Sequence, residues 1–204
     1  MITSMFKLIS VTNRKLCRED FLTRMERVAA SGVDGVILRE KDLSAEGYGL
    51  LANQVTEICR KHGTFCFLHT YARKALDLGI KSIHLPLTVL KGLDEESRSA
   101  FQQLGASCHS LEDVREAEQL GCTYVTLGHI FATDCKPGLP PRGLELLRTV
   151  CSAASIPVYA IGGISPENAA ACREAGAAGV CVMSGLMRCD DPAEYVNRFR
   201  AAFQ

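Results

Sequence analysis

The sequence predicts an α/β fold, a single small (β/α)8 TIM barrel formed by residues 1–204. Short β-rich segments alternate eight times with longer amphipathic segments. A glycine suited to the end of a helix precedes a strand at Gly32, Gly79, Gly121 and Gly176, and each interval accommodates two strand-helix units. Polar residues follow the strands, as expected of a barrel that binds ligands at the carboxyl ends of its strands.

Each strand is defined by a short apolar run, and each helix by apolar residues at helical spacing. The predicted strands are 7–13, 35–40, 64–69, 82–86, 105–110, 124–129, 157–163 and 179–185. The predicted helices are 18–31, 44–62, 71–78, 93–104, 111–120, 143–153, 166–175 and 192–202. A doubly wound open sheet is the alternative, disfavoured because no Gly-x-Gly-x-x-Gly motif follows the first strand.

Composition limits the class of partner. The chain has 23 Lys and Arg residues and 23 Asp and Glu residues, without a long run of either sign, so we expect no nucleic-acid or membrane-surface binding. No apolar stretch approaches the ~20 residues of a membrane span. Ten cysteines are scattered without a Cys-x-x-Cys pair, which favours a reducing compartment. We expect a cytoplasmic protein with a small-molecule partner, and the apolar outer helix at 195–203 allows a homodimer.

Glycines at the ends of the last two strands predict a phosphate site. Gly162 and Gly163 follow strand seven, while Ser184 and Gly185 follow strand eight. Glycine lets backbone N–H groups approach an anion closely, and barrels often hold phosphate at this position. The alternative interpretation is a pair of tight turns that merely need glycine.

Cationic residues lie at two other strand exits. Arg39 and Lys41 are two residues apart and are expected to point to the same side of strand two. A guanidinium offers a planar fork to a carboxylate or phosphate, which favours substrate contact over a solvated rim for Arg39. The long loop after strand six begins at His129 and contains Lys136 before Pro137-Gly138, which suits a binding loop.

Four histidines end strands three to six: His69, His84, His109 and His129. They raise a metal site as an alternative. The lack of a His-x-His pair or of a nearby inward carboxylate disfavours it, so we expect no metal and no cofactor.

Five segments, in order, resemble those of a known family: Leu38 through Asp42, Cys108-His109-Ser110 with Glu112, Gly128 through Lys136, Ala160 through Ile164, and Val182 through Gly185. Together they are similar to the thiamine phosphate synthase and TenI family of small (β/α)8 barrels, over nearly the whole chain. The synthase branch carries acidic residues after strands three and four that hold Mg²⁺ on a diphosphate substrate. This chain has His69-Thr70 and Leu87-Thr88-Val89 there.

The loop after strand six adds to this distinction. It has His129 where the synthase branch has proline, and Cys135 where that branch has a second threonine. The segment therefore resembles TenI-type thiazole tautomerase. That resemblance implies a metal-free isomerase that aromatises a thiazole carboxylate phosphate tautomer in thiamine biosynthesis. A histidine can take and return the proton near neutral pH.

The resemblance also implies roles for individual residues. His129 and Arg39 would be catalytic, and the phosphorylated thiazole would be held by Lys41, Ser107, His109 and Lys136, with its phosphate on Gly162, Gly163, Ser184 and Gly185. Two alternatives remain open, a Mg²⁺-dependent thiamine phosphate synthase and a non-catalytic ligand-binding or regulatory barrel. The presence of His129 favours the tautomerase over both.

Overall fold

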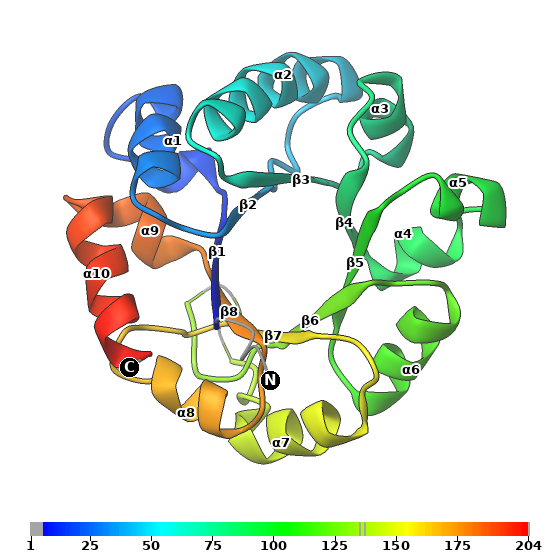
Figure 1. Cartoon of the computed structure of the whole chain (residues 1–204), viewed down its shortest axis with the longest axis vertical. Coiled ribbons are helices and arrows are strands. Elements are labelled where there is room, and N and C mark those ends of the chain that lie inside the picture. The colour runs from blue at the N-terminus through cyan, green and yellow to red at the C-terminus, as the bar shows by residue number, and fades with distance from the viewer. Residues whose placement is uncertain (1–5, 135, 137, 204) are drawn as a thin grey trace.

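The computed structural model shows a closed barrel of eight parallel strands in sequential order, surrounded by helices (Figure 1). It describes residues 6–134, 136 and 138–203. The strands are β1 (Lys7–Val11), β2 (Gly35–Leu38), β3 (Phe65–His69), β4 (Ser82–Pro86), β5 (Gln103–Cys108), β6 (Tyr124–Gly128), β7 (Val158–Ile161) and β8 (Gly179–Val182). Because β8 pairs with β1, from Lys7 opposite Gly179 to Ser10 opposite Val182, the predicted (β/α)8 barrel is confirmed and the open sheet is excluded.

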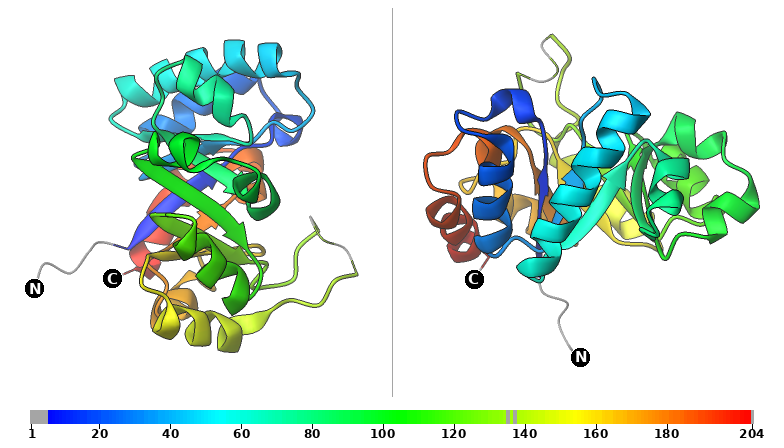
Figure 2. Two further views of the ribbon diagram at one scale, coloured as in Figure 1. Left: turned by 90° about the vertical axis from the view of Figure 1, so that its right-hand side faces the viewer. Right: turned by 90° about the horizontal axis from the view of Figure 1, so that it is seen from above.

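Helices form the outer layer of the barrel. They are α1 (Phe21–Ala30), α2 (Ala45–Lys61), α3 (Ala72–Asp77), α4 (Leu87–Lys91), α5 (Glu95–Ser99), α6 (Leu111–Gln119), α7 (Gly143–Ala153), α8 (Ala169–Glu174), α9 (Ser184–Arg188) and α10 (Pro192–Ala202), with a short 3-10 turn η1 (Arg14–Leu16) after β1. Ser44 caps α2 as predicted, since its hydroxyl accepts a hydrogen bond from the Gly47 N–H. The loop between β6 and α7 stands out from one end of the barrel (Figure 2).

The barrel interior changes from apolar to polar along its axis. Side chains alternate along a strand, so every second residue points inward. The middle of the barrel is filled by Ile9, Ile37, Phe67, Tyr124 and Cys181, which form one buried cluster. A larger apolar core, which includes Tyr48 of α2 and Phe199 of α10, fills the space between the strands and the helices. The polar inward positions that remain lie toward the carboxyl ends of the strands, where a ligand site is expected.

The structure corrects the prediction between residues 87 and 110. A helix at 93–104 and a strand at 105–110 were expected, but two short helices, α4 and α5, precede a strand that begins at Gln103. The Asp94 carboxylate accepts the Ser97 N–H and starts α5 there. Gln103 pairs with Ser82 of β4, and Leu104 is buried in the sheet. Tertiary pairing thus overrides the helical spacing of the apolar residues.

The last two strands are shorter than predicted. β7 ends at Ile161 and β8 at Val182, and Ser184 already belongs to α9. The predicted helix at 166–175 begins only at Ala169. Gly162 and Gly163 therefore lie in the turn beyond β7, and Ser184 and Gly185 begin the short helix α9.

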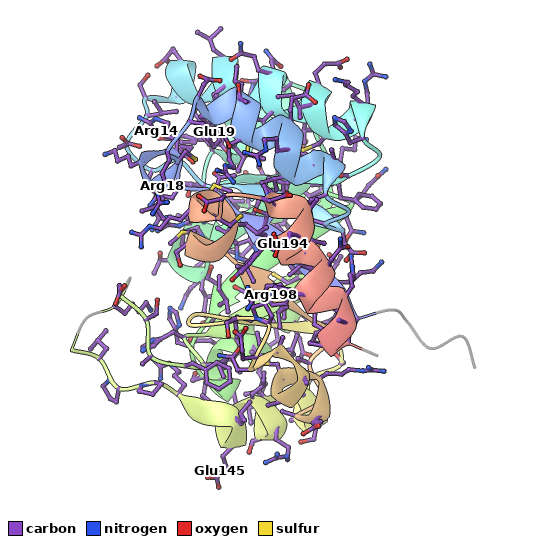
Figure 3. All side chains as sticks on the ribbon, turned by 90° about the vertical axis from the view of Figure 1, so that its left-hand side faces the viewer. Arg14, Arg18, Glu19, Glu145, Glu194 and Arg198 are labelled. Atoms are coloured by element: carbon purple, nitrogen blue, oxygen red, sulfur yellow. The ribbon has the colours of Figure 1, made fainter. Side chains whose placement is uncertain are left out.

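The surface carries interspersed charges, as the balanced composition predicts. Figure 3 shows both signs on the α1 and α10 face, where Arg18, Glu19, Glu194 and Arg198 are labelled. Arg198 pairs there with Glu167. No helix among the described residues is long and apolar enough to cross a membrane. Pairing of two copies through 195–203 stays a prediction.

Candidate active site

One pocket of about 330 Å³ lies at the carboxyl ends of the strands. Its volume is in the range of small-molecule sites. Nine of the ten predicted site residues line it: Arg39, Lys41, Ser107, His109, His129, Lys136, Gly162, Gly163 and Ser184. They come from several different strand exits, so the closed barrel brings together residues that are up to 145 positions apart, from Arg39 to Ser184 (184 − 39 = 145). Cys135 and Pro137 of the predicted binding loop lie outside the described residues.

Gly185 is the predicted residue that does not line the pocket. A β-carbon at this position would lie 2.2 Å from the hydroxyl oxygen of Tyr195 in α10. Its lack of a side chain therefore serves the packing of α10 against α9. A role for Gly185 in phosphate binding stays a prediction and would depend on its backbone alone.

The turn after β7 brings bare backbone to the pocket. Gly162 and Gly163 have φ angles of +95° and +67°, a left-handed conformation that favours glycine. A β-carbon added to Gly162 would lie 2.3 Å from Cβ of His129, and one added to Gly163 would lie 2.4 Å from the Ala132 carbonyl oxygen. The Asn168 side-chain amide donates to the Gly163 carbonyl at 2.8 Å and so fixes the turn. Within residues 6–134, 136 and 138–203, the Gly163 N–H has no acceptor, which leaves it available to an anion.

A buried carboxylate organises the exit of β2. Glu40 is 3% exposed and accepts hydrogen bonds from the Thr12 hydroxyl at 2.6 Å and from the Arg14 backbone N–H at 3.0 Å. The Arg14 guanidinium pairs with Glu40 at 3.1 Å and with Asp42 at 2.6 Å. Thr12 also accepts the Arg39 N–H at 2.9 Å. This network holds the backbone on both sides of Arg39, whose own side chain turns into the pocket.

Three cations share the pocket. Arg39 and Lys41 line it from β2, and Lys136 lines it from the loop after β6. Partial burial lowers the pKa of Lys41, and the positive charges of Arg39 and Lys136 lower it further. No carboxylate pairs with any of the three among the described residues. The arrangement favours an anionic ligand, which would reduce the mutual repulsion.

His129 lies between the long loop and the glycine turn. It is 6% exposed, and its Nε2–H donates to the Leu139 carbonyl at 3.2 Å. This bond assigns the proton to Nε2 and leaves Nδ1 with a free lone pair. Among the described residues, Nδ1 is buried without a hydrogen-bond partner. Such an unpaired nitrogen can accept a hydrogen bond or a proton from a ligand.

The other three histidines differ in position. His69 lines the pocket, and the Thr70 hydroxyl oxygen lies 2.6 Å from its Nδ1. His109 also lines it, and its Nδ1–H donates to the Gly128 carbonyl at 2.6 Å. His84 lies below the pocket wall, hydrogen-bonded inside the barrel. The described residues contain no group of three or more His, Cys, Asp or Glu side chains that could hold a metal ion.

Some pocket residues were missed in the sequence. Thr126 lines the pocket from β6, and His84 supports Ser107 from behind with Nε2 2.9 Å from the hydroxyl oxygen. The alternation of inward positions could have identified Thr126, which is two residues before Gly128. The His84–Ser107 contact depends on the pairing of β4 with β5 and has no local signal.

Fold and site together define a (β/α)8 barrel with a cationic pocket at the carboxyl ends of its strands. The model of the thiamine monophosphate synthase (TMP-TENI) family matches residues 8–186. The chain therefore belongs to the thiamine monophosphate synthase family, whose proteins serve thiamine biosynthesis.

Several relatives and solved structures are similar over most of this chain. A putative thiamine-phosphate synthase 2 of Aquifex aeolicus is 34% identical over 178 residues, which cover 87% of this chain and 96% of the relative. A thiamine-phosphate synthase of Syntrophomonas wolfei is 31% identical, covering 100% of this chain and 99% of the relative. One from Prochlorococcus marinus is 31% identical over 91% of this chain, which spans only 53% of that relative. A thiamine phosphate pyrophosphorylase structure from Pyrococcus furiosus has a TM-score of 0.84 at 25% identity, covering 98% of this chain and 96% of that one.

These findings correct one prediction. The sequence motifs predicted an isomerase, a thiazole tautomerase. The relatives are named thiamine-phosphate synthases, which are transferases, and the isomerase assignment is therefore wrong. That assignment depended on the missing acidic residues after β3 and β4 and on His129 and Cys135 in the loop after β6.

Among the described residues, the pocket lining does not fit the magnesium ion that the synthase branch of the family implies, because it contains no carboxylate. Mg²⁺ is usually held through one or two carboxylates. The Glu40 carboxylate is buried against Thr12 and Arg14, and Asp42 is paired with Arg14. β3 and β4 end in His69 and Pro86.

Proposed function

We propose that this chain is a transferase of the thiamine-phosphate synthase type that uses its own cations to bind a diphosphate substrate. One observation carries the proposal: a single pocket presents bare backbone at Gly162 and Gly163 together with three cations, Arg39, Lys41 and Lys136, that pair with no carboxylate in the described part of the chain. A phosphorylated thiazole would place its phosphate on the glycine turn. The cations would face the diphosphate of the second substrate.

The product defines the reaction. In thiamine phosphate, the thiazole nitrogen is bonded to a methylene group on an aminopyrimidine. The transferase would therefore form this carbon–nitrogen bond while the bond between the methylene carbon and a diphosphate oxygen breaks. Pyrophosphate leaves with the electron pair of that bond. Arg39 and Lys41 would stabilise the charge that develops on the leaving oxygen, which is the largest contribution expected in this type of site.

His129 and the smaller polar groups would position the organic parts of the two substrates. Nδ1 of His129 has a free lone pair and can accept a hydrogen bond from the amino group of the aminopyrimidine. Ser107 and His109 line the same wall and can contact the organic part of either substrate. Lys136, on the loop, would cover the ligand.

The test is direct synthesis. Purified protein is mixed with thiazole phosphate and the diphosphate of the aminopyrimidine half of thiamine, with added Mg²⁺ or with EDTA. We expect thiamine phosphate and pyrophosphate in equal amounts, and a loss of at least about tenfold in kcat/KM in Arg39→Met, since one charged contact contributes about 1.5–3 kcal/mol. Absence of product in both conditions would contradict the proposal.

A second candidate, a non-catalytic barrel that binds the phosphorylated ligand, is favoured by the lack of a carboxylate cluster among the described residues. It predicts saturable binding of thiamine phosphate by calorimetry without turnover. Pyrophosphate release, measured on the same protein sample, distinguishes the two candidates, because only the transferase produces it.

A further inference from the structure

His84 is buried beneath the pocket in a hydrogen-bonded group that the proposed reaction does not use. It is 3% exposed and lies on β4. Its Nδ1 is 3.2 Å from the hydroxyl oxygen of Tyr124, and its Nε2 is 2.9 Å from that of Ser107 and 3.3 Å from that of Thr126. Ser107 and Thr126 line the pocket, whereas Tyr124 does not. His84 therefore connects the barrel interior to the pocket wall.

His84 is uncharged at neutral pH. Its burial lowers its pKa to about 3. The ring of His69 stacks on it with 5.9 Å between centroids, and burial also lowers the pKa of His69, to about 2. A neutral imidazole carries one N–H and one lone pair, so one nitrogen of His84 donates a hydrogen bond and the other accepts one.

Tyr124 determines which nitrogen accepts. Its hydroxyl is buried, and His84 is its hydrogen-bond partner within the part of the chain that the structure describes. If Nδ1 carried the proton, it would donate to the phenol oxygen and leave the phenol hydrogen buried without an acceptor, which is costly. The phenol instead donates to Nδ1, which places the imidazole proton on Nε2.

We propose that Tyr124 holds His84 in the Nε2-protonated tautomer and thereby makes Ser107 a hydrogen-bond donor toward the ligand. The Nε2–H donates to the Ser107 oxygen at 2.9 Å, the nearer of its two hydroxyl neighbours. Because Nε2 then has no lone pair, the Ser107 hydroxyl cannot donate to His84 and is left to donate toward the pocket. Ser107 would select ligands that present an acceptor there, such as a carboxylate or phosphate oxygen or a ring nitrogen. Only the identity of that ligand rests on the proposed function.

The tautomer can be measured without any ligand. In nitrogen-15 labelled protein, the imidazole shifts distinguish a protonated ring nitrogen from a bare one, and His84→Gln assigns the His84 signals. We expect a protonated Nε2 and a bare, hydrogen-bonded Nδ1 at neutral pH. A protonated Nδ1 would overturn the proposal. Tyr124→Phe should give mixed tautomers, and an unchanged Nε2–H population in that variant would also overturn it.

A matched control lies next to Tyr124 in the barrel interior. Tyr159 has its ring centroid 5.6 Å from that of Tyr124, and its hydroxyl has no hydrogen-bond partner among the described residues. Tyr159→Phe removes the same group and should leave the His84 shifts in place. A shift as large as that of Tyr124→Phe would show a general change in packing and would contradict the assignment to Tyr124.

Binding connects the tautomer to recognition, with thiamine phosphate as the probe. Ser107→Ala should weaken binding roughly tenfold, and Tyr124→Phe several-fold. In the Ser107→Ala background, Tyr124→Phe should cause no further loss of affinity, because the hydroxyl group whose hydrogen the His84 tautomer directs is no longer present. Additive losses would indicate a merely structural role and overturn the connection. If the unaltered protein fails to bind thiamine phosphate, the proposed function is contradicted while the tautomer measurement still decides this inference.

Discussion

The β7–β8 side of the pocket differs from the β2 side in the groups it presents to a ligand. Gly162 and Gly163 offer backbone held rigidly by the fold, whereas Arg39 and Lys41 offer charges on long side chains. Backbone donors cannot titrate and lose no side-chain entropy on binding. The cations attract anions from a distance, and this attraction decreases with salt. In the proposed function, the glycine turn would therefore position a phosphate and the β2 side would supply charge.

The first prediction tests the support of the β2 side. Arg14→Met should reduce the free energy of unfolding by about 3 kcal/mol, because it leaves the Glu40 carboxylate buried without its cation. Urea unfolding measures this. The double variant Arg14→Met with Glu40→Gln should recover part of the loss, since it removes the unpaired charge. A loss below about 1 kcal/mol in the single variant would mean that Thr12 and the backbone suffice to hold Glu40.

The second prediction tests the glycine side. Gly79 has φ +69° and open space where a β-carbon would lie, while Gly163 has φ +67° and a carbonyl oxygen 2.4 Å from that position. Gly79→Ala should cost about 1 kcal/mol for the backbone conformation alone. Gly163→Ala should cost at least about 1 kcal/mol more, because the neighbouring loop must move. Thermal or urea unfolding of the two variants separates the effect of crowding from that of backbone strain. Equal losses of stability in Gly79→Ala and Gly163→Ala would contradict the close approach of the Ala132 carbonyl oxygen to Gly163.

The third prediction concerns the histidines between the two sides. Burial lowers the pKa of His69 to about 2 and of His84 to about 3, whereas the unfolded chain titrates near 6.5. The unfolded state therefore binds more protons between about pH 6.5 and 3, and stability decreases as pH falls through that window. Each histidine should remove about 2 kcal/mol between neutral pH and about pH 5. Urea unfolding at both pH values measures the loss, and His84→Gln should reduce it by about half.

The fourth and smallest prediction isolates the charge of the β2 side. Arg39→Met should weaken binding of inorganic pyrophosphate about tenfold, which corresponds to about 1.4 kcal/mol. It should also make binding less sensitive to salt. Arg148→Met, on the exposed face of α7, is the control and should change neither quantity. Calorimetry at low and high salt measures the affinity and its salt dependence. An equal salt dependence for Arg39→Met and the unaltered protein would contradict the role of the Arg39 charge in binding.

The positions of most site residues could be predicted because they follow from local patterns. A residue that directly follows an apolar strand lies at the carboxyl end of the barrel whatever its neighbours are. Arg39, His129 and Gly162 each follow a strand in this way and line the pocket. The roles of these residues remain proposals. Gly185 follows the same pattern but does not line the pocket, and its missing side chain accommodates Tyr195 of α10. The assignment as an isomerase failed for another reason. It depended on a few substituted motif positions, whereas the relatives named as synthases are similar over most or all of the chain.

The sequence by itself determined the eight strand-helix units, their order and the polar mouth, because alternation, caps and glycine positions are properties of neighbouring residues. Only the tertiary structure decided which histidines face the pocket and which lie below it. His84 and His69 pair in register on adjacent strands, yet only His69 reaches the pocket. The contacts of His84 with Ser107 and Tyr124 likewise join three strands through their pairing. Such contacts depend on the register of a closed barrel, and no single segment contains that register.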